Sequence, residues 1–351
     1  MNTLERVAVE AARAALLHAG VAPPDVGALL DSDYSSLLFR PGKSWGPGGR
    51  LQRAPELWGT TRSAASLLRR AAEKVDAVPD DEARVVQLAR LAEEAGRAAL
   101  AFLHVAVLGT ARLEELCRLR FGDGPEGCGQ EGSFLCTGQG RRLLEFRTTS
   151  LKVGHSLASS ATPRHSCRPL PASASRLVFV CFGLLRPGWV AVVLGGTSED
   201  ARRLRAAPFS ALSKLEQDLM TLCFPRAQVA DGTSSQRAVA VAGSTLRRWV
   251  SGDVGSALGV PGLGVRVLRR MLSCFLVLSD PEGQQAVSRG SSGSAAWTAG
   301  AVLFGHSAQT HLVYLPSSVV GGDAACSVVV RSQQERCVRL WCSYLGRPRD
   351  V

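Results

Sequence analysis

The chain lacks isoleucine altogether, and its 351 residues include only one asparagine and four lysines. Arginine therefore accounts for 37 of the 41 basic residues. The depleted residues all have AT-rich codons, so this composition is typical of a gene in strongly GC-rich DNA. The abundance of Arg, Ala, Gly and Val partly reflects mutation pressure, and the formal charge of +11 is correspondingly weak evidence for an anionic partner.

Signals of export and membrane insertion are also missing. The one asparagine, Asn2, does not form an N-glycosylation site. Glu5 and Arg6 stand where a secretory signal would have apolar residues. The longest apolar run, 177–194, is interrupted by Arg186-Pro187-Gly188, which predicts two strands joined by a turn and no membrane span. We therefore expect a cytoplasmic or nuclear protein that is not secreted, with its ten cysteines as thiols.

The strongest candidate for a nucleotide site is Gly42-Lys43-Ser44, the three residues that close a P-loop. The full pattern requires glycine at position 37, which is Leu37, and backbone N–H groups that Pro41 cannot supply. The glycines and proline at 46–49 also prevent a helix from following Ser44. This segment therefore predicts an exposed loop, and we expect no cofactor.

A second glycine-rich segment, residues 192–205, predicts a strand, two glycines and the start of a helix. Such a helix start presents backbone N–H groups to anions. However, Glu199 and Asp200 occupy the first turn, where they complement the helix dipole and would repel phosphate. We interpret this segment as the start of an ordinary capped helix.

Motifs for metal binding and catalysis are weak. The sequence contains no C-x-x-C pair, and the spacing of the cysteines and histidines near the middle of the chain is irregular, so we predict no metal site and leave a small structural zinc site as an open alternative. Those residues are Cys117, Cys128, Cys136, His155, His165 and Cys167. No nucleophile elbow precedes a predicted helix. We predict no catalytic residues, and an enzyme is the less favoured class.

Residues 1–121 predict a helical module. Asn2 begins the first helix, with Leu4 and Val7 on its inner face, and Gly20 ends it. The apolar positions at 80–108 alternate steps of three and four, which predicts a long helix that packs within the same domain or, less favoured, forms a coiled coil. His104 falls on the polar side of this helix, so we expect it at the surface. Two further helices are predicted at residues 25–39 and 55–75.

Residues 122–141 predict a glycine-rich linker, and residues 142–351 a second domain. Short apolar runs, several of them consecutive near the end of the sequence, indicate antiparallel strands. The predicted fold class is thus α+β: an N-terminal helical module followed by a mixed, largely antiparallel α+β domain. The strands are predicted at 143–148, 177–185, 189–194, 238–242, 274–278, 299–304, 311–315, 326–331 and 337–344, and the helices at 209–224, 245–251 and 263–272.

By elimination, the leading interpretation is a non-enzymatic intracellular protein-interaction protein, either an adaptor or a subunit of a larger assembly. Ten cysteines in a GC-rich composition favour a vertebrate gene or a large DNA virus of a vertebrate host, and a viral protein would be a virion structural or tegument-type component. Trp and Arg dominate the energetics of protein interfaces. The hypothesised contacts with the protein partner are Trp45, Trp58, Arg247, Arg248 and Trp249.

Nucleic-acid binding is the first alternative, and a hydrolase with an unrecognised site is the second. Short basic clusters in the predicted second domain would contact phosphates if they lined one groove. The aromatic content of 6% leaves few rings on which bases could stack, which favours a solvated surface instead. The arginines of this alternative are Arg202, Arg203, Arg205, Arg266, Arg269 and Arg270.

Overall fold

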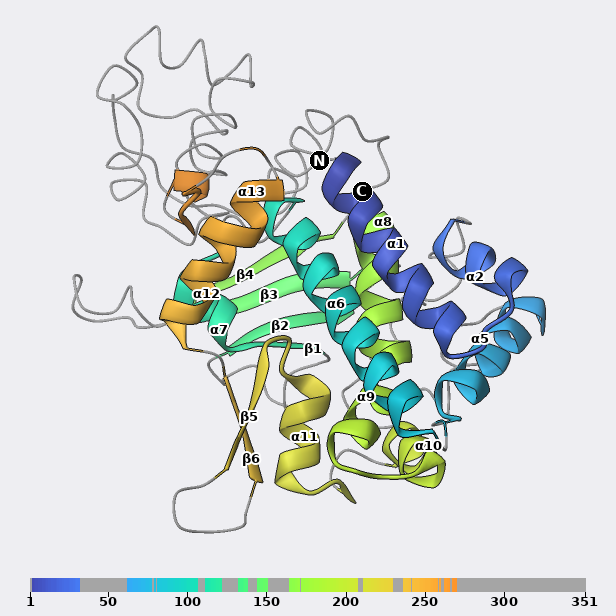
Figure 1. Ribbon diagram of the computed structural model, residues 1–351. Coiled ribbons are helices and arrows are strands. Elements are labelled where there is room, and N and C mark those ends of the chain that lie inside the picture. The colour runs from blue at the N-terminus through green and yellow to red at the C-terminus, as the bar shows by residue number, and fades with distance from the viewer. Residues whose placement is uncertain are drawn as a thin grey trace, which may run out of the picture.

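Helices dominate the part of the chain that the structure describes (Figure 1). This computed structural model describes residues 2–31, 62–77, 79, 81–106, 111–121, 132–137, 144–150, 164–170, 172–207, 211–229, 236–240, 242–257, 259, 262–265 and 267–269. Because these residues are mainly helical, the predicted α+β fold class is wrong. The strands predicted between 274 and 344 lie outside the described residues.

The N-terminal helices are α1 (Asn2–His18), α2 (Pro23–Leu30), α5 (Arg62–Val75) and α6 (Glu82–Ala106). α1 begins and ends as predicted, and Gly20 beyond it has a φ of 82°, a conformation that glycine adopts without strain. α1 and α6 lie side by side (Figure 1), which confirms that α6 packs within its own chain.

The inner face of α1 differs from the prediction. Val7, expected inside, is 49% exposed. Alanine occurs on several sides of this helix, so the sequence offers little contrast between a buried and an exposed face. The buried residues are Leu4, Ala8, Ala12, Ala15 and Leu16.

The apolar run at 177–194, predicted as two strands, is instead part of one continuous helix. It comprises α8 (Ala172–Val178), the π-helical segment η3 (Phe179–Leu185) and α9 (Arg186–Val193). Every residue of η3 is buried, so the helix has no polar face there. A short apolar run that is buried on all sides shows no period by which a helix could be distinguished from a strand.

Pro187 is accommodated in this helix because another element supplies the missing hydrogen-bond donor. Proline has no N–H to donate to the carbonyl of Gly183, four residues earlier. Arg205 of α10 (Ser198–Ala206) donates to that carbonyl at 3.3 Å and to the carbonyl of Leu184 at 2.7 Å. Asp76 in turn accepts two hydrogen bonds of 2.6 Å from Arg205. The segment that follows α5 is thereby tied to α10 and η3.

Gly188 allows α9 to approach the end of α5. A Cβ atom at this position would lie 2.8 Å from the carbonyl oxygen of Val75 and 3.2 Å from its Cγ1. The Pro187-Gly188 pair, which suggested a turn, is therefore compatible with a helix because of its tertiary surroundings.

Six strands accompany the helices in the described part of the chain. β1 (Leu119–Phe121), β2 (Gly132–Thr137), β3 (Leu144–Ser150) and β4 (Arg164–Pro169) form a sheet in the order β1-β2-β3-β4. The β1–β2 pair is parallel and the other two pairs are antiparallel. β5 (Pro225–Val229) and β6 (Gln236–Ala240) form a separate antiparallel pair. β3 and β6 overlap the strands predicted at 143–148 and 238–242.

Short helices complete the described fold. These are α7 (Leu113–Cys117), α11 (Lys214–Thr221), α12 (Gly243–Trp249), the π-helical segment η5 (Val250–Val254) and α13 (Gly255–Ala257). α11 and α12 lie within or close to the helices predicted at 209–224 and 245–251. α10 is confirmed as an ordinary capped helix, since the Thr197 hydroxyl accepts a hydrogen bond from the backbone N–H of Asp200.

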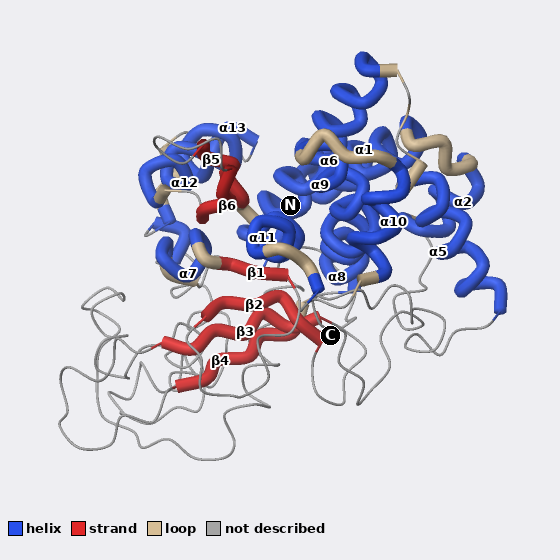
Figure 2. Tube along the Cα trace, turned by 90° about the horizontal axis from the view of Figure 1, so that it is seen from below, coloured by secondary structure: helices blue, strands red, loops and turns tan. Residues whose placement is uncertain are grey.

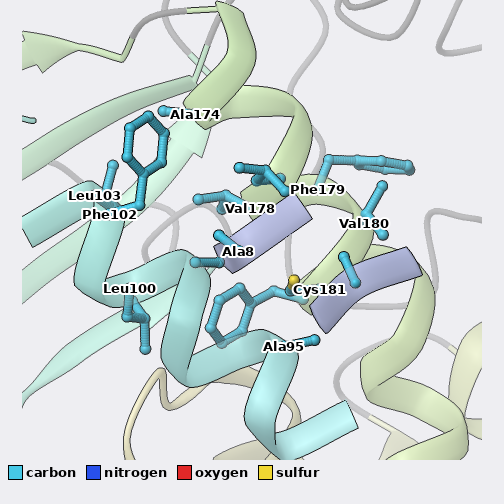
Figure 3. Packing of buried hydrophobic residues seen from close by; sticks show 14 of the residues in the cluster. Ala8, Ala95, Leu100, Phe102, Leu103, Ala174, Val178, Phe179, Val180 and Cys181 are labelled. Atoms are coloured by element: carbon cyan, nitrogen blue, oxygen red, sulfur yellow. The ribbon is translucent and has the colours of Figure 1, made fainter. Parts of the chain in front are cut away.

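One hydrophobic core joins the helices to the four-stranded sheet, whose strands lie along one side of the helices in Figure 2. Figure 3 shows side chains such as Ala8, Phe102 and Phe179 packed between the helices. In the sheet, the paired residues Leu135 and Phe146 are both buried. The core thus contains residues from both sides of the predicted linker, and the division into two domains stays a prediction.

Ser173–Val193 is the one helix in the described part of the chain that is long and apolar enough to span a membrane. Of the most apolar 18-residue stretch of this helix, 78% is buried inside the protein. This burial is what a core helix requires, so the segment is weak evidence for a membrane span.

Candidate ligand-binding cavity at Arg186

A cavity of about 290 Å³ lies among α6, the η3–α9 helix and α12. Gly96 of α6 forms part of one wall, and Arg186 and Trp189 of α9 form another. Phe224, just before β5, and Trp249, at the end of α12, also line it. The walls come from segments far apart in sequence, which the helical packing brings together.

Arg186 is the most unusual residue of the cavity. It is 7% exposed, yet its guanidinium forms no ion pair with any described residue. Nη1 donates one long hydrogen bond of 3.3 Å to the carbonyl of Leu219. The guanidinium carbon lies 4.6 Å from the ring centre of Phe182 and 4.8 Å from that of Trp189. Burial lowers the pKa of Arg186 to about 10, so it remains a cation at neutral pH.

Arg205 shows what a compensated buried arginine looks like in this protein. The side chains of Arg205 and Asp76 are only 9% and 4% exposed, and their charges balance. Two backbone carbonyls accept further hydrogen bonds from the same guanidinium. Burying a charge is costly unless it is paired and hydrogen-bonded. Arg205 meets that condition and Arg186 does not.

Aromatic rings form the apolar wall beside Arg186. Trp249 packs edge-on against Phe224, with ring centres 5.3 Å apart. The ring centre of His104 lies 6.2 Å from that of Trp249, on the side of the protein interior. These ring contacts pack Trp249 into the wall of the cavity.

His104 is 1% exposed, so the prediction of a surface position was wrong. Its helix is covered on more sides than an amphipathic pattern assumes, because α12 also packs near it. Burial lowers the pKa of His104 to about 4, and neither ring nitrogen has a hydrogen-bond partner among the described residues. At neutral pH this imidazole is an uncharged packing group.

Two thiols, Cys181 and Cys223, also line the cavity. Burial raises the pKa of each to about 12, and nearby Arg186 only partly opposes this effect. Since the thiolate is the reactive form of cysteine, both thiols are protonated and unreactive at neutral pH. Both cysteines belong to the hydrophobic core.

The remaining charged residues of the lining lie at its exposed side. Glu93 and Arg97 form an ion pair at 2.6 Å on the surface of α6. Arg248 and Asp253 are exposed on α12 and η5. Among the described residues of the lining, three arginines and two carboxylates leave a net charge of +1, and the one buried charge is that of Arg186.

Only some of the predicted partner-binding residues lie at the cavity. Arg248 and Trp249 line the cavity, and Arg247 is exposed nearby on α12. Trp45 and Trp58 lie outside the described residues, as do Gly42-Lys43-Ser44. The sequence analysis missed Arg186 and Gly96 as lining residues. An arginine within a long apolar run was the one available signal, and it was attributed to a turn.

The arginines of the nucleic-acid alternative do not form one group in the described structure. Arg202 is exposed on α10. Arg203 pairs with Glu216, and Arg205 is buried with Asp76. Arg269 is buried, and Arg266 and Arg270 lie outside the described residues. The first cluster is thus largely engaged within the protein.

The open question of a zinc site involves residues from several elements. Cys117 ends α7, Cys136 lies in β2, and His165 and Cys167 lie in β4. Within the described ranges, no group of three or more metal-ligating side chains comes together. Cys128 and His155 lie outside those ranges.

Comparisons with protein-family models, with curated proteins and with solved structures found no match for this chain.

Proposed function

We propose that this chain is a non-enzymatic protein-interaction protein that receives a short segment of a protein partner in the Arg186 cavity. The observation that carries the proposal is the buried guanidinium of Arg186, which lines a cavity and forms no close ion pair with a described residue; the carboxylate of Glu93 acts on it only from a distance. Buried charges in folded proteins are ordinarily paired. A bound partner would supply the missing pair.

The size and chemistry of the cavity support a protein ligand. Its volume of about 290 Å³ lies near the lower end for ligand pockets, roughly 300–1,000 Å³. This volume fits one or two side chains better than a large cofactor. Trp189, Trp249 and Arg186 are of the residue types that contribute most to protein interfaces.

The ionisable groups around the cavity support binding over catalysis. Cys181 and Cys223 have raised pKa values and are held as thiols. His104 has a lowered pKa and is buried behind Trp249, so it is poorly placed to exchange protons with a ligand. Catalytic groups instead have pKa values tuned toward the working pH.

Gly96 provides a direct test because it lines the cavity without contacting Arg186. A Cβ atom at 96 would lie 3.9 Å from Phe182, an ordinary contact, so alanine fits. Gly96→Met would place a flexible side chain in the cavity, and Gly96→Ala is the matched control. The tagged full chain and both variants are purified from vertebrate cells, each with and without nuclease treatment, and retained proteins are quantified by mass spectrometry.

We expect one protein partner to survive nuclease treatment at near-stoichiometric yield with wild type and Gly96→Ala. Its yield should fall at least about tenfold with Gly96→Met, because the cavity is then filled. Equal yield with Gly96→Met would refute binding in the cavity. Loss of all bound proteins on nuclease treatment would instead support the nucleic-acid alternative.

A further inference from the structure

We infer that Arg186 binds the C-terminal carboxylate of the protein partner, with the partner's last, apolar side chain against Trp189 and Trp249. This inference rests on the proposed function, since it names the part of the partner that enters the cavity. A single ligand of this kind would account for three features of the cavity: the buried guanidinium, the aromatic wall and the small volume.

Arg186 has hydrogen-bonding capacity left for a ligand. A guanidinium carries five N–H donors. One of these, on Nη1, donates the 3.3 Å bond to the carbonyl of Leu219. Nε and Nη2 have no hydrogen-bond partner among the described residues. Phe182 and Trp189 lie against the guanidinium, so its N–H edge is the polar surface that a ligand can reach.

A carboxylate matches this edge in shape and in charge. Its two oxygens accept parallel hydrogen bonds from an arginine edge in a planar, bidentate arrangement. Among its described residues, the lining carries three arginines, Arg97, Arg186 and Arg248, against the two carboxylates Glu93 and Asp253. A single negative charge therefore neutralises the lining, whereas a phosphate dianion would reverse its sign.

The end of a chain fits better than a chain that passes through. The cavity of about 290 Å³ accepts one terminal residue, whose carboxylate and side chain leave the same Cα and so reach Arg186 and the aromatic wall together. An internal acidic residue offers a carboxylate without an apolar group beside it. Trp249 and Phe224 provide an apolar contact beside the carboxylate position. Capture of a terminal carboxylate together with the last side chain is a recurring mode of peptide recognition.

The test uses two matched pools of random octapeptides, one with free C-terminal carboxylates and one amidated. Each pool is passed over the immobilised full chain, and retained peptides are identified by mass spectrometry. We expect retention of acid-pool peptides that end in an apolar residue. Retention from the amidated pool should be at least about tenfold lower, because a charge-assisted hydrogen bond to a buried group is lost.

Variants locate the binding site of these peptides. Arg186→Gln should reduce retention at least about tenfold. Arg202→Gln, which removes the same charge from an exposed position on α10, should leave retention unchanged. Gly96→Met keeps Arg186 and should also abolish retention, so it provides the answer even if Arg186→Gln does not fold.

Equal retention of both pools, retention that survives Arg186→Gln, or no retention at all overturns the inference. Retention of amidated peptides with internal acidic residues also overturns it. The same variants, tested with the partner from cells, distinguish this inference from the proposed function. If the partner is lost with Gly96→Met but kept with Arg186→Gln, the cavity binds the partner and only the carboxylate assignment is wrong. If both variants keep the partner, the proposed function is wrong as well.

Discussion

His104 and Arg186 are both buried polar residues, and they differ in their charge at neutral pH. His104 faces the protein interior and becomes neutral, since burial lowers its pKa to about 4. Arg186 keeps its charge because the pKa of a guanidinium, even lowered to about 10, stays above neutral pH. At the residue scale, His104 therefore affects stability, while Arg186 keeps the charge that the proposed binding requires.

His104 should make the protein less stable in mild acid. Its pKa is lowered from 6.5 in the unfolded chain to about 4 in the fold, so between these values the unfolded state binds more protons. Above pH 6.5 His104 is neutral in both the folded and the unfolded state, and the free energy of unfolding is not reduced. As the pH falls from 6.5 toward 4, protons bind His104 in the unfolded state first, and the free energy of unfolding decreases. The difference corresponds to about 3 kcal/mol of unfolding free energy.

His104→Leu should remove this part of the pH dependence. At pH 7 the variant should be at least as stable as wild type, because two ring nitrogens without partners among the described residues are replaced by carbon. Urea unfolding of both proteins at pH 7 and pH 4.5 measures the difference. The same loss of stability in both proteins would show that His104 is not responsible.

At the scale of elements, the long helix α8–η3–α9 depends on contacts made by other segments. Arg205 of α10 donates to the carbonyls around Pro187, and Asp76 beyond α5 holds Arg205. Gly188 lets the end of α5 approach α9 closely. The position of Arg186 in the cavity therefore follows from the packing of α5 and α10 as much as from its own helix.

Asp76→Asn should be strongly destabilising. It leaves Arg205 as a buried charge without its counter-ion, and breaking a buried pair in this way costs about 3–5 kcal/mol. Asp25→Asn is the matched control, because Asp25 pairs with Arg70 at the surface, where such pairs contribute about 0–1 kcal/mol. Urea unfolding at pH 7 compares the two variants, and equal losses of stability would contradict this role of Asp76.

At the scale of the whole molecule, the sequence predicts those features that depend on local patterns. The start of α1, the length of α6 and the cap of α10 follow from capping residues and helical periodicity. The helix through 177–194 could not be predicted, because an apolar run buried on all sides has no period. The interpretation of this run as two strands contributed to the wrong fold class.

The candidate site was only partly predictable. Arg248 and Trp249 were chosen as interface residue types, and both line the cavity. Arg186 acquires its significance from Leu219, Phe224 and α12, which lie far along the chain and are placed near it by tertiary packing. A single sequence shows which side chains are charged, but not which remain without a counter-ion after folding.

The most direct test of the central claim is hydrogen–deuterium exchange of the full chain alone and with the nuclease-resistant protein partner that the proposed function predicts. Binding in the cavity should slow exchange in the segment from α12 to η5, which includes Arg248, Trp249 and Asp253. Exchange in α2, away from the cavity, should not change. Protection in α2 with none in the α12–η5 segment would contradict binding of the partner in the Arg186 cavity.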